Sequence, residues 1–231
     1  MKIGIIGAGQ IGGTLTRRLA QLGHEVFVAN SRGPASLAGL AKETGANAVT
    51  VQEAARAGNV VIVTIPEAKI GNLPKNLFED VPGDVVVIDT GNYYPRERDS
   101  RIDQIEAGML ESRWVETQLG RPVVKAFNTM NYKKLLELGR PTGTPGRLAL
   151  PVAGDDPRAK QVVLGLIEQL GFDGVDAGGL DDSWRQQPGT PVYDKELDSA
   201  GVRHALGEAR KERLPQWRAT GNTPGRFAQR A

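Results

Sequence analysis

The sequence has no cysteine and only two histidines among its 231 residues, and aromatic side chains are few. The absence of cysteine excludes a disulfide scaffold, a thiolate zinc site and a cysteine nucleophile, and we predict no metal site. The longest apolar stretch, residues 60–65, is far below the ~20 residues that span a bilayer, so we expect no membrane partner. The short apolar run after Lys2 ends in glycines and does not match a signal peptide. These absences favour a cytoplasmic protein.

Charge is nearly balanced, with 29 Lys and Arg residues against 27 Asp and Glu residues. Nucleic-acid-binding domains usually gather many more cations on one face, so we expect no nucleic-acid partner. Glycine is in clear excess, at 29 of 231 residues, against a usual frequency of ~7%. The chain is therefore expected to make many tight turns or close backbone approaches.

Short β-branched runs alternate with helical patterns along the chain. Runs bounded by Gly, Pro or Asn are typical of strands in a buried parallel sheet. They cover residues 2–6, 25–29, 59–64, 84–89, 122–127, 147–153 and, more weakly, 172–176. Apolar spacing and capping patterns at Thr50 and Asp156 predict helices at 11–22, 51–57 and 157–170. The alternation predicts an α/β fold, a Rossmann-type doubly wound and mostly parallel sheet.

The chain divides by pattern into residues 1–180, expected to be a Rossmann domain, and a short helical C-terminal extension, 181–231. The extension is too short for a separate substrate domain, so we expect it to pack on the first part, with one helix at 195–213. Two Gly- and Pro-rich segments, 139–146 and 180–193, are long enough to be functional loops.

Aromatic and proline residues follow residue 183 and have two interpretations. They form either a clasp that packs the tail on the core or a lid over a second substrate, and packing favours the clasp. The residues concerned are Trp184, Pro188, Pro191 and Tyr193.

A glycine motif follows the first predicted strand and opens the first predicted helix. It reads Gly7, Ala8, Gly9, Gln10, Ile11 and Gly12, the GxGxxG pattern of dinucleotide-binding βαβ units. Gly7 allows the tight turn, Gly9 lets a diphosphate approach the backbone, and Gly12 lets helix and strand pack closely. The free N–H groups at the helix start then favour an anion. The motif predicts a nicotinamide dinucleotide site.

The residues after the second predicted strand favour NADP(H) over NAD(H). An NAD enzyme usually has Asp or Glu there to bind the ribose 2′-OH, but this chain has Asn30, Ser31 and Arg32. Neutral donors and a guanidinium suit a 2′-phosphate. The alternative is that Arg32 is only a solvated surface residue.

Other strand ends are expected to face the cofactor, because parallel sheets bind ligands beyond the carboxyl ends of their strands. Pro66 would hold the backbone beside the nicotinamide ribose, and Asn92 and Asn128 could donate and accept towards ribose or carboxamide. Asp89 is either a ligand or the cap of a turn. The remaining residues of these ends are Thr64, Ile65, 90–91, 126–127, Thr129 and 154–155.

The sequence offers no clear acid or base. No tyrosine is followed four residues later by lysine, and His24 and His204 are not at strand ends. Catalytic residues therefore stay unassigned. Hydride transfer between two bound rings needs little beyond stacking, distance and exclusion of water.

Five segments resemble the coenzyme F420-dependent NADP reductases: KIGIIGAGQIGGTLTRRLAQLGHEV, VFVANSR, VVKAFNT, PVAGDDPRAKQVV and DAG. They are also similar to the oxidoreductase domain of six-transmembrane ferric reductases. The resemblance covers about residues 1–180 and implies an NADP-binding Rossmann domain whose nicotinamide meets a flavin-like ring. By position, it implies that the glycine loop holds the diphosphate and that Ser31 and Arg32 hold the 2′-phosphate. The implied nicotinamide side is Ile65, Asn92, Ala126 and Asn128.

These observations predict an NADPH-dependent oxidoreductase that passes hydride to deazaflavin F420 or to FAD or FMN. The segment after residue 183 has no counterpart in the deazaflavin enzymes, so the acceptor stays open. The alternatives are an NADP(H)-binding redox sensor without turnover and a small-carbonyl reductase that uses Thr129 or Tyr132 as proton donor. A homodimer is expected because related Rossmann domains often complete their cleft across a two-fold axis.

Overall fold

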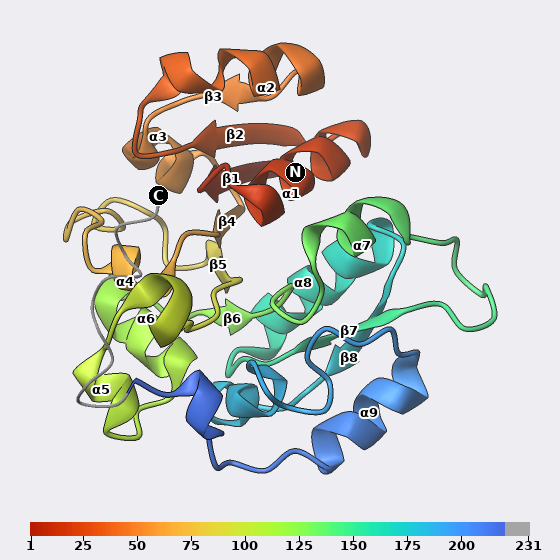
Figure 1. Ribbon diagram of the computed structural model, residues 1–231. Helices are drawn as coiled ribbons and strands as arrows, with labels where there is room; N and C mark the ends of the chain where they lie inside the picture. The colour runs from red at the N-terminus through yellow and green to blue at the C-terminus, as the bar shows by residue number, and fades with distance from the viewer. Residues whose placement is uncertain (220–231) are drawn as a thin grey trace.

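The computed structural model describes residues 1–219 and is built on a six-stranded sheet (Figure 1). The strand order is β3-β2-β1-β4-β5-β6, and all neighbouring strands are parallel. The strands are β1 (Lys2–Ile6), β2 (Glu25–Ala29), β3 (Asn47–Ala48), β4 (Val60–Val63), β5 (Val86–Asp89) and β6 (Val124–Lys125). This is the order of the dinucleotide-binding fold, which reverses between β1 and β4. The predicted Rossmann-type fold is confirmed.

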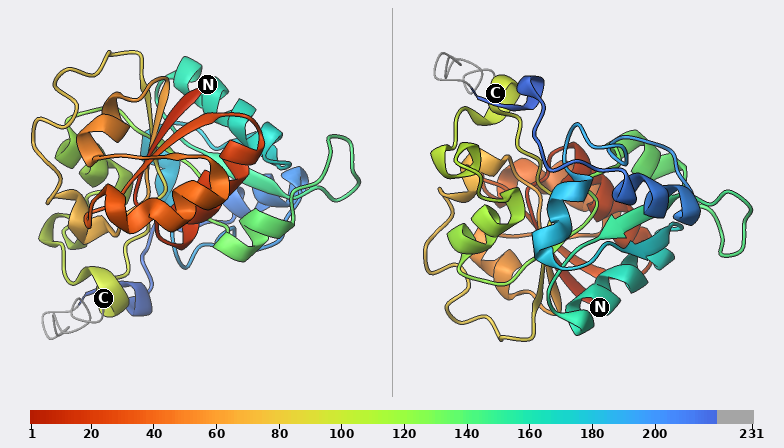
Figure 2. Two further views of the ribbon diagram at one scale, coloured as in Figure 1. Left: turned by 90° about the horizontal axis from the view of Figure 1, so that it is seen from above. Right: turned by 90° about the horizontal axis from the view of Figure 1, so that it is seen from below.

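Helices cover both faces of the sheet (Figures 1 and 2). They are α1 (Gln10–Gln21), α2 (Ala38–Thr44), α3 (Val51–Arg56), α4 (Glu67–Ile70), α5 (Asp103–Glu106), α6 (Glu111–Leu119), α7 (Tyr132–Glu137), α8 (Pro157–Gln169) and α9 (Ser199–Gly207). Short helical turns lie at Pro34–Leu37, Pro95–Asp99, Leu180–Gln186 and Pro215–Trp217. No helix within residues 1–219 is long and apolar enough to cross a bilayer.

Alternate residues of each strand enter two separate apolar cores. Val60 and Ile62 pack with side chains of α1 and α8, whereas Val61 and Val63 pack with side chains of α3 and α6. Successive strand side chains point to opposite faces, so a run that is apolar at every position is needed when both faces are covered. This explains why the strand runs read as continuous hydrophobic segments.

The predicted capping patterns hold at α3 and α8. Thr50 and Glu53 form a reciprocal capping box at α3, and Asp156 accepts a hydrogen bond from Arg158 N at α8. Residues 139–146 lie outside any helix or strand, as expected, and project from the body of the protein (Figure 2).

The last two predicted strands do not join the main sheet. β7 (Ala149–Val152) and β8 (Asp173–Asp176) form a separate parallel pair. β7 meets β6 only through one antiparallel bridge, between Lys125 and Ala153. Pro151 lies in β7 and has no N–H to donate to a ladder, which suits an edge strand. The runs at 147–153 and 172–176 thus form strands, as predicted, but in a sheet of their own.

The predicted helix at 195–213 is shorter in the structure. α9 begins after Asp198, whose side chain accepts a hydrogen bond from Gly201 N, and it ends at Gly207. It packs on β7 and β8, and its buried residues Val202, Ala205 and Leu206 share a small core with them. Residues 208–214 continue the chain without helix and lead to the short helical turn Pro215–Trp217.

We predict that two adjacent glycines of α1 respond oppositely to alanine. A Cβ at Gly12 would lie 1.9 Å from Gly7 O, whereas a Cβ at Gly13 would lie 3.2 Å from the end of the flexible Arg17 side chain and 3.8 Å from Ala8 O. Gly12→Ala should lower the free energy of unfolding by ~1–3 kcal/mol through overpacking. Gly13→Ala should raise it by up to ~1 kcal/mol through helix propensity. Urea unfolding measures both, and equal effects of the two substitutions would contradict the packing argument.

Candidate functional site

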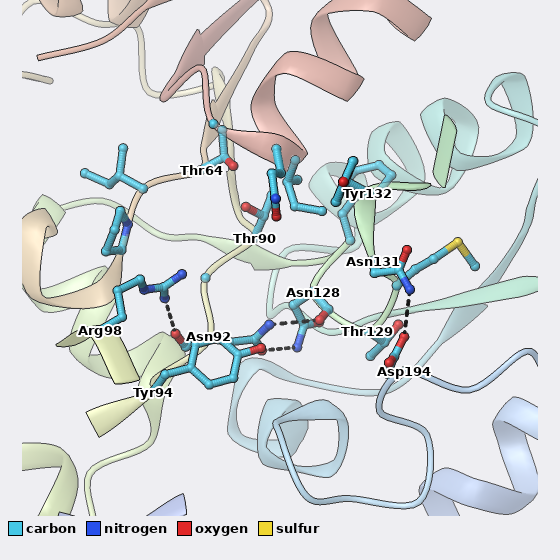
Figure 3. A pocket seen from close by; sticks show the side chains of 18 of the residues that line it. Thr64, Thr90, Asn92, Tyr94, Arg98, Asn128, Thr129, Asn131, Tyr132 and Asp194 are labelled. Atoms are coloured by element: carbon cyan, nitrogen blue, oxygen red, sulfur yellow. Dashed lines mark hydrogen bonds between the residues drawn. The ribbon is translucent and has the colours of Figure 1, made fainter. Parts of the chain in front are cut away.

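A cavity of about 380 Å³ lies at the carboxyl edge of the sheet, where the strand order reverses (Figure 3). The strand ends after β1, β4, β5 and β6 form its walls, together with one segment of the C-terminal extension. The lining residues are Gly9, Gln10, Ile11, Thr64, Ile65, Pro66, Thr90, Gly91, Asn92, Tyr94, Arg98, Phe127, Asn128, Thr129, Met130, Asn131, Tyr132, Tyr193 and Asp194. Twelve of the glycine-loop and strand-end residues predicted to face the cofactor lie here: Gly9, Gln10, Ile11, 64–66, 90–92 and 127–129.

Each glycine of the motif has a distinct environment. Gly7 has a φ of 114°, and a Cβ there would lie 2.3 Å from Thr64 O. A Cβ at Gly12 would overlap Gly7 O, so these two glycines join β1, β4 and α1 beneath the cavity and do not line it. A Cβ at Gly9 meets no protein atom within 4 Å. The motif thus leaves open space only at the position predicted to approach a diphosphate.

The start of α1 is free of competing groups. Gly9 is the N-cap and makes no side-chain cap, and the first turn holds no acidic residue. The positive end of the helix dipole therefore faces the cavity without an internal anion.

The end of β2 lies beside the glycine loop, because Gly7 N donates to Ala29 O at 2.8 Å. Asn30 Oδ1 accepts from Arg32 N at 2.9 Å, and the Asn30 amide also bonds Ser36 Oγ at 2.9 Å. Asn30 therefore shapes the turn, and its predicted contact with the cofactor stays a prediction. Ser31 and Arg32 are exposed, and no hydrogen bond within residues 1–219 engages the Arg32 guanidinium.

Asn92 and Asn128 use most of their amide groups on one another. Asn92 Nδ2 donates to Asn128 O at 2.9 Å, and Asn128 Nδ2 donates to Asn92 Oδ1 at 3.0 Å and to Gln186 O at 2.7 Å. Gln186 Nε2 in turn donates to Asn128 Oδ1 at 2.9 Å. Both hydrogens of Asn128 Nδ2 are therefore occupied. In this structure Asn128 therefore fixes the cavity wall, and its predicted contact with the cofactor stays a prediction.

Ala126 does not reach the cavity, contrary to the expectation. It is fully buried in the core, whereas the next residue, Phe127, which was also predicted to face the cofactor, lines the cavity. Phe127 has a φ of 63°, in the left-handed region that residues with a Cβ rarely adopt. Such strain costs about 1–3 kcal/mol and is commonest at functional sites. Gly154 and Asp155 also lie outside this cavity, since Asp155 binds Arg113 at 2.8 Å.

Sequence reasoning missed five lining residues: Tyr94, Arg98, Met130, Asn131 and Asp194. Arg98 belongs to a π-helical turn, Pro95–Asp99, which has no periodic signal in the sequence. Asn131 caps α7 by accepting from Lys133 N and Lys134 N. An Asn directly before a helix is the one signal that could have located it.

The aromatic residues of the extension both pack and line the cavity. Tyr193 bonds the hydroxyl of Tyr94, and both tyrosines contact Trp217, with ring centroids 6.3 and 5.9 Å away. Burial raises the pKa of Tyr94 and of Tyr193, so both hydroxyls stay protonated at neutral pH. Tyr193 thus serves as clasp and as cavity wall, whereas Trp184 lies outside the cavity against Arg185.

Comparisons with known proteins decide the family. Residues 2–93 match the family model described as NADP oxidoreductase, coenzyme F420-dependent. YjhV of Escherichia coli strain K12 is 44% identical over 117 residues, which is 47% of this chain and 82% of that protein. The chain belongs to the F420-dependent NADP oxidoreductase family. It is therefore an NADP-dependent oxidoreductase.

Solved structures extend the likeness over most of the chain. The hypothetical protein SMa0349 from Sinorhizobium meliloti superposes with a TM-score of 0.71 at 33% identity, covering 84% of this chain and 94% of that chain. A protein of Arthrobacter sp. FB24, described as a candidate F420-dependent NADP reductase, gives 0.65 at 26% identity and covers 79% of this chain and 87% of its own.

A buried ionic cluster lies behind the cavity wall of this oxidoreductase. Lys125 Nζ donates to Asp89 Oδ2 at 2.8 Å and to Gly91 O at 2.7 Å, and Glu67 Oε1 lies 4.0 Å from it. Asp89 Oδ1 also accepts from Gly91 N at 2.8 Å. Asp89 therefore caps a turn, and the cluster fixes Gly91, which lines the cavity. Sequence reasoning missed Lys125, a charged residue in an apolar run.

Glu67 is the unusual member of the cluster. Its side chain is fully buried, and neither carboxyl oxygen has a hydrogen-bond partner within residues 1–219. Burial, and then the negative charge of Asp89, raise the pKa of Glu67 well above its ordinary value. Burial alone would lower the pKa of Lys125, but the charge of Asp89 raises it on balance. A protonated Glu67 leaves the cluster with one carboxylate and one ammonium, which is neutral.

We predict that Glu67→Gln stabilises the protein more at high pH than at low pH. Because the pKa of Glu67 is raised on folding, the native state binds the extra proton above the ordinary carboxyl pKa. The free energy of unfolding of the wild type then falls as pH rises, by at most ~1.4 kcal/mol per pH unit. Glutamine cannot ionise, so the stability of the variant relative to wild type should increase between about pH 5 and pH 8.

Urea unfolding across this range measures the difference. The exposed Glu79→Gln is the matched control and should change stability by less than ~0.5 kcal/mol at every pH. A Glu67→Gln variant whose relative stability is independent of pH would show that Glu67 is ionised in the native state.

Proposed function

We propose that this protein transfers a hydride between NADP(H) and a flavin-like ring, F420, FMN or FAD, which binds in the same cavity. The observation that carries the proposal is the extent of the cavity. It begins at the open Gly9 position of the dinucleotide motif and continues to Tyr94 and Tyr193. Its volume of about 380 Å³ is within the range of sites that hold a ring-sized ligand.

The residues present fit the cofactor. Open space at Gly9 and the uncapped start of α1 suit a diphosphate. Ser31 and Arg32, beside the glycine loop, suit a 2′-phosphate, and residues 64–66 would border the nicotinamide half. When bound, the reduced nicotinamide supplies a hydride from C4.

The work of the chain is to position two rings and exclude water. Ile65, Pro66 and Phe127 give the cavity apolar surface, and the amides of Asn92 and Asn128 are locked by mutual hydrogen bonds. Such prearranged walls lower the cost of bringing two reactants together. No side chain has to form a covalent bond or abstract a proton from carbon.

A second candidate is a small-carbonyl reductase. It is favoured by the hydroxyls of Thr129 and Tyr132, which both line the cavity and either of which could donate a proton to a carbonyl oxygen. A sensor that binds NADP(H) without turnover needs only the cofactor half of the cavity. A second ring seated beside the nicotinamide separates the hydride-transfer proposal from the sensor.

We also propose that residues 181–219 complete the site and are not an independent domain; the rest of the predicted extension, 220–231, lies outside the described residues. Support comes from Tyr193 and Asp194, which line the cavity, and from Gln186, which joins the amide network of the cavity wall. The homodimer and the cytoplasmic location stay predictions.

We predict that Arg32→Ala weakens NADPH binding but not NADH binding. The loss of a charge-assisted contact to the 2′-phosphate costs ~1.5–3 kcal/mol, about tenfold or more in affinity. NADH lacks that phosphate and should bind the variant as it binds the wild type. Titration calorimetry with both cofactors measures the ratio, and the exposed Arg158→Ala is the matched control. An NADPH affinity that stays within about twofold would remove Arg32 from the site.

We predict that NADPH oxidation by the wild type requires a flavin-like acceptor. Purified protein is mixed anaerobically with NADPH and, separately, with F420, FMN and FAD, and the absorbance bands of both partners are followed. One acceptor should be reduced in step with NADPH, mole for mole. Tight NADPH binding with no acceptor reduced would favour the sensor, and oxidation that occurs only with a small aldehyde or ketone would favour the carbonyl reductase.

A further inference from the structure

Arg98 is the one cation among the cavity-lining residues of the described chain. Figure 3 shows it at the same end of the cavity as Tyr94, on the side opposite Asp194. Asp194 is itself bound by Asn131 Nδ2 at 3.2 Å and lies 3.5 Å from Lys134 Nζ. The negative charge across the cavity is therefore compensated locally and does not neutralise Arg98.

The guanidinium of Arg98 is held in place by three different groups. Nη2 donates to Asn92 O at 2.7 Å and to Asp99 Oδ2 at 3.1 Å. Its central carbon lies 5.0 Å from the centre of the Tyr94 ring, a distance at which a cation is attracted to the ring face. The arginine is thus fixed before any ligand arrives, which avoids the entropy cost of ordering it on binding.

Arg98 keeps the capacity to bind an anion. No hydrogen bond within residues 1–219 engages Nη1, and the side chain is 42% exposed. Its partner Asp99 also accepts from Tyr94 N at 2.8 Å and from Ala68 N at 3.2 Å, so its charge is shared among three donors. The free Nη1 group of this guanidinium can donate a hydrogen bond to a planar group that carries negative charge.

The neighbouring walls suit a planar ring. The hydroxyls of Tyr94 and Tyr193 bond one another, which holds the two phenol rings together at this end of the cavity. Trp217 packs against both from the C-terminal segment. Aromatic walls favour offset or edge contacts with a second ring. The cofactor half is at the glycine loop, so this end is left for the second substrate.

We propose that Arg98 stabilises the negative charge that forms on the acceptor ring during hydride transfer. This inference rests on the proposed function. One C–H bond breaks at nicotinamide C4 and one C–H bond forms on the acceptor, and the electron pair moves with the hydrogen. NADPH is oxidised to NADP⁺, and a neutral acceptor gains one negative charge, later neutralised by a solvent proton. A fixed cation beside that charge is worth more in a partly enclosed site than in water.

The test compares Arg98→Met and Arg98→Lys with wild type, using the acceptor that the wild type reduces. Arg96→Met is the matched control, because Arg96 is exposed in the same helical turn and does not line the cavity. We expect Arg98→Met to lower kcat about tenfold or more, Arg98→Lys to recover part of it, and Arg96→Met to leave it unchanged. The affinity for NADPH should stay within about twofold of wild type in all three variants.

Affinities for the oxidised and the reduced acceptor distinguish a loss of electrostatic stabilisation in Arg98→Met from a general change in the structure of the site. By anaerobic calorimetry, wild type should bind the reduced, anionic ring about tenfold more tightly than the oxidised ring. Arg98→Met should lose this preference, which a purely structural change would not selectively remove. An unchanged preference, or an equal loss of affinity for both forms and for NADPH, would overturn the inference while leaving the proposed function intact.

A second pair of acceptors distinguishes ring charge from a permanent phosphate. FMN is compared with riboflavin, or F420 with its phosphate-free chromophore. If Arg98 acts on the ring charge, Arg98→Met should lower kcat by the same factor with both members of a pair. A decrease in kcat that occurs only with the phosphate-bearing member would show that Arg98 binds the phosphate, and it would overturn the inference. A wild type that binds NADPH and reduces none of these rings would overturn the proposed function, and the inference with it.

Discussion

The site depends on one steric constraint, the close contact between the first strand, the fourth strand and the first helix. Gly7 and Gly12 meet there, and a Cβ on either would fall within 2.3 Å of a carbonyl oxygen. Because no side chain separates these elements, the free N–H groups of α1 are held at the point where the strand order reverses. Gly9 is in the same loop but faces open space. Two glycines therefore build the scaffold, and one leaves room for a ligand.

The rest of the cavity wall is fixed from behind by buried polar groups. Lys125 and Asp89 hold both backbone groups of Gly91, and the amides of Asn92, Asn128 and Gln186 close on one another. Buried polar groups are costly unless they are paired, so these networks permit few alternative arrangements. The wall facing the ligand is consequently rigid, although it is made of loops. Hydride transfer between rings requires that kind of positioning.

The sequence predicted the fold well and the site in part, for a physical reason. Strand runs and the glycine motif are local patterns. The Rossmann-type fold, and the place of Gly9 and Pro66 at the carboxyl edge of the sheet, could therefore be inferred from the sequence. The pairing of Asn128 with Gln186 joins residues 58 positions apart, and the separation of β7 from the main sheet also depends on long-range geometry. Arg98 lies in a π-helical turn without a periodic signal. Contacts that join distant segments have no signature in a single sequence.

Charge is distributed along the cavity in a way that suits a redox reaction between two bound molecules. Arg32 lies near the glycine loop and would meet the phosphate that distinguishes NADP from NAD. Arg98 lies at the other end, beside Tyr94. The middle is formed by neutral or apolar residues such as Ile65 and Phe127. Arg98 at one end of the cavity, and Arg32 beside the glycine loop and outside the cavity lining, would bind anionic groups of the two proposed ligands, and the apolar residues between them would border the transferred hydrogen.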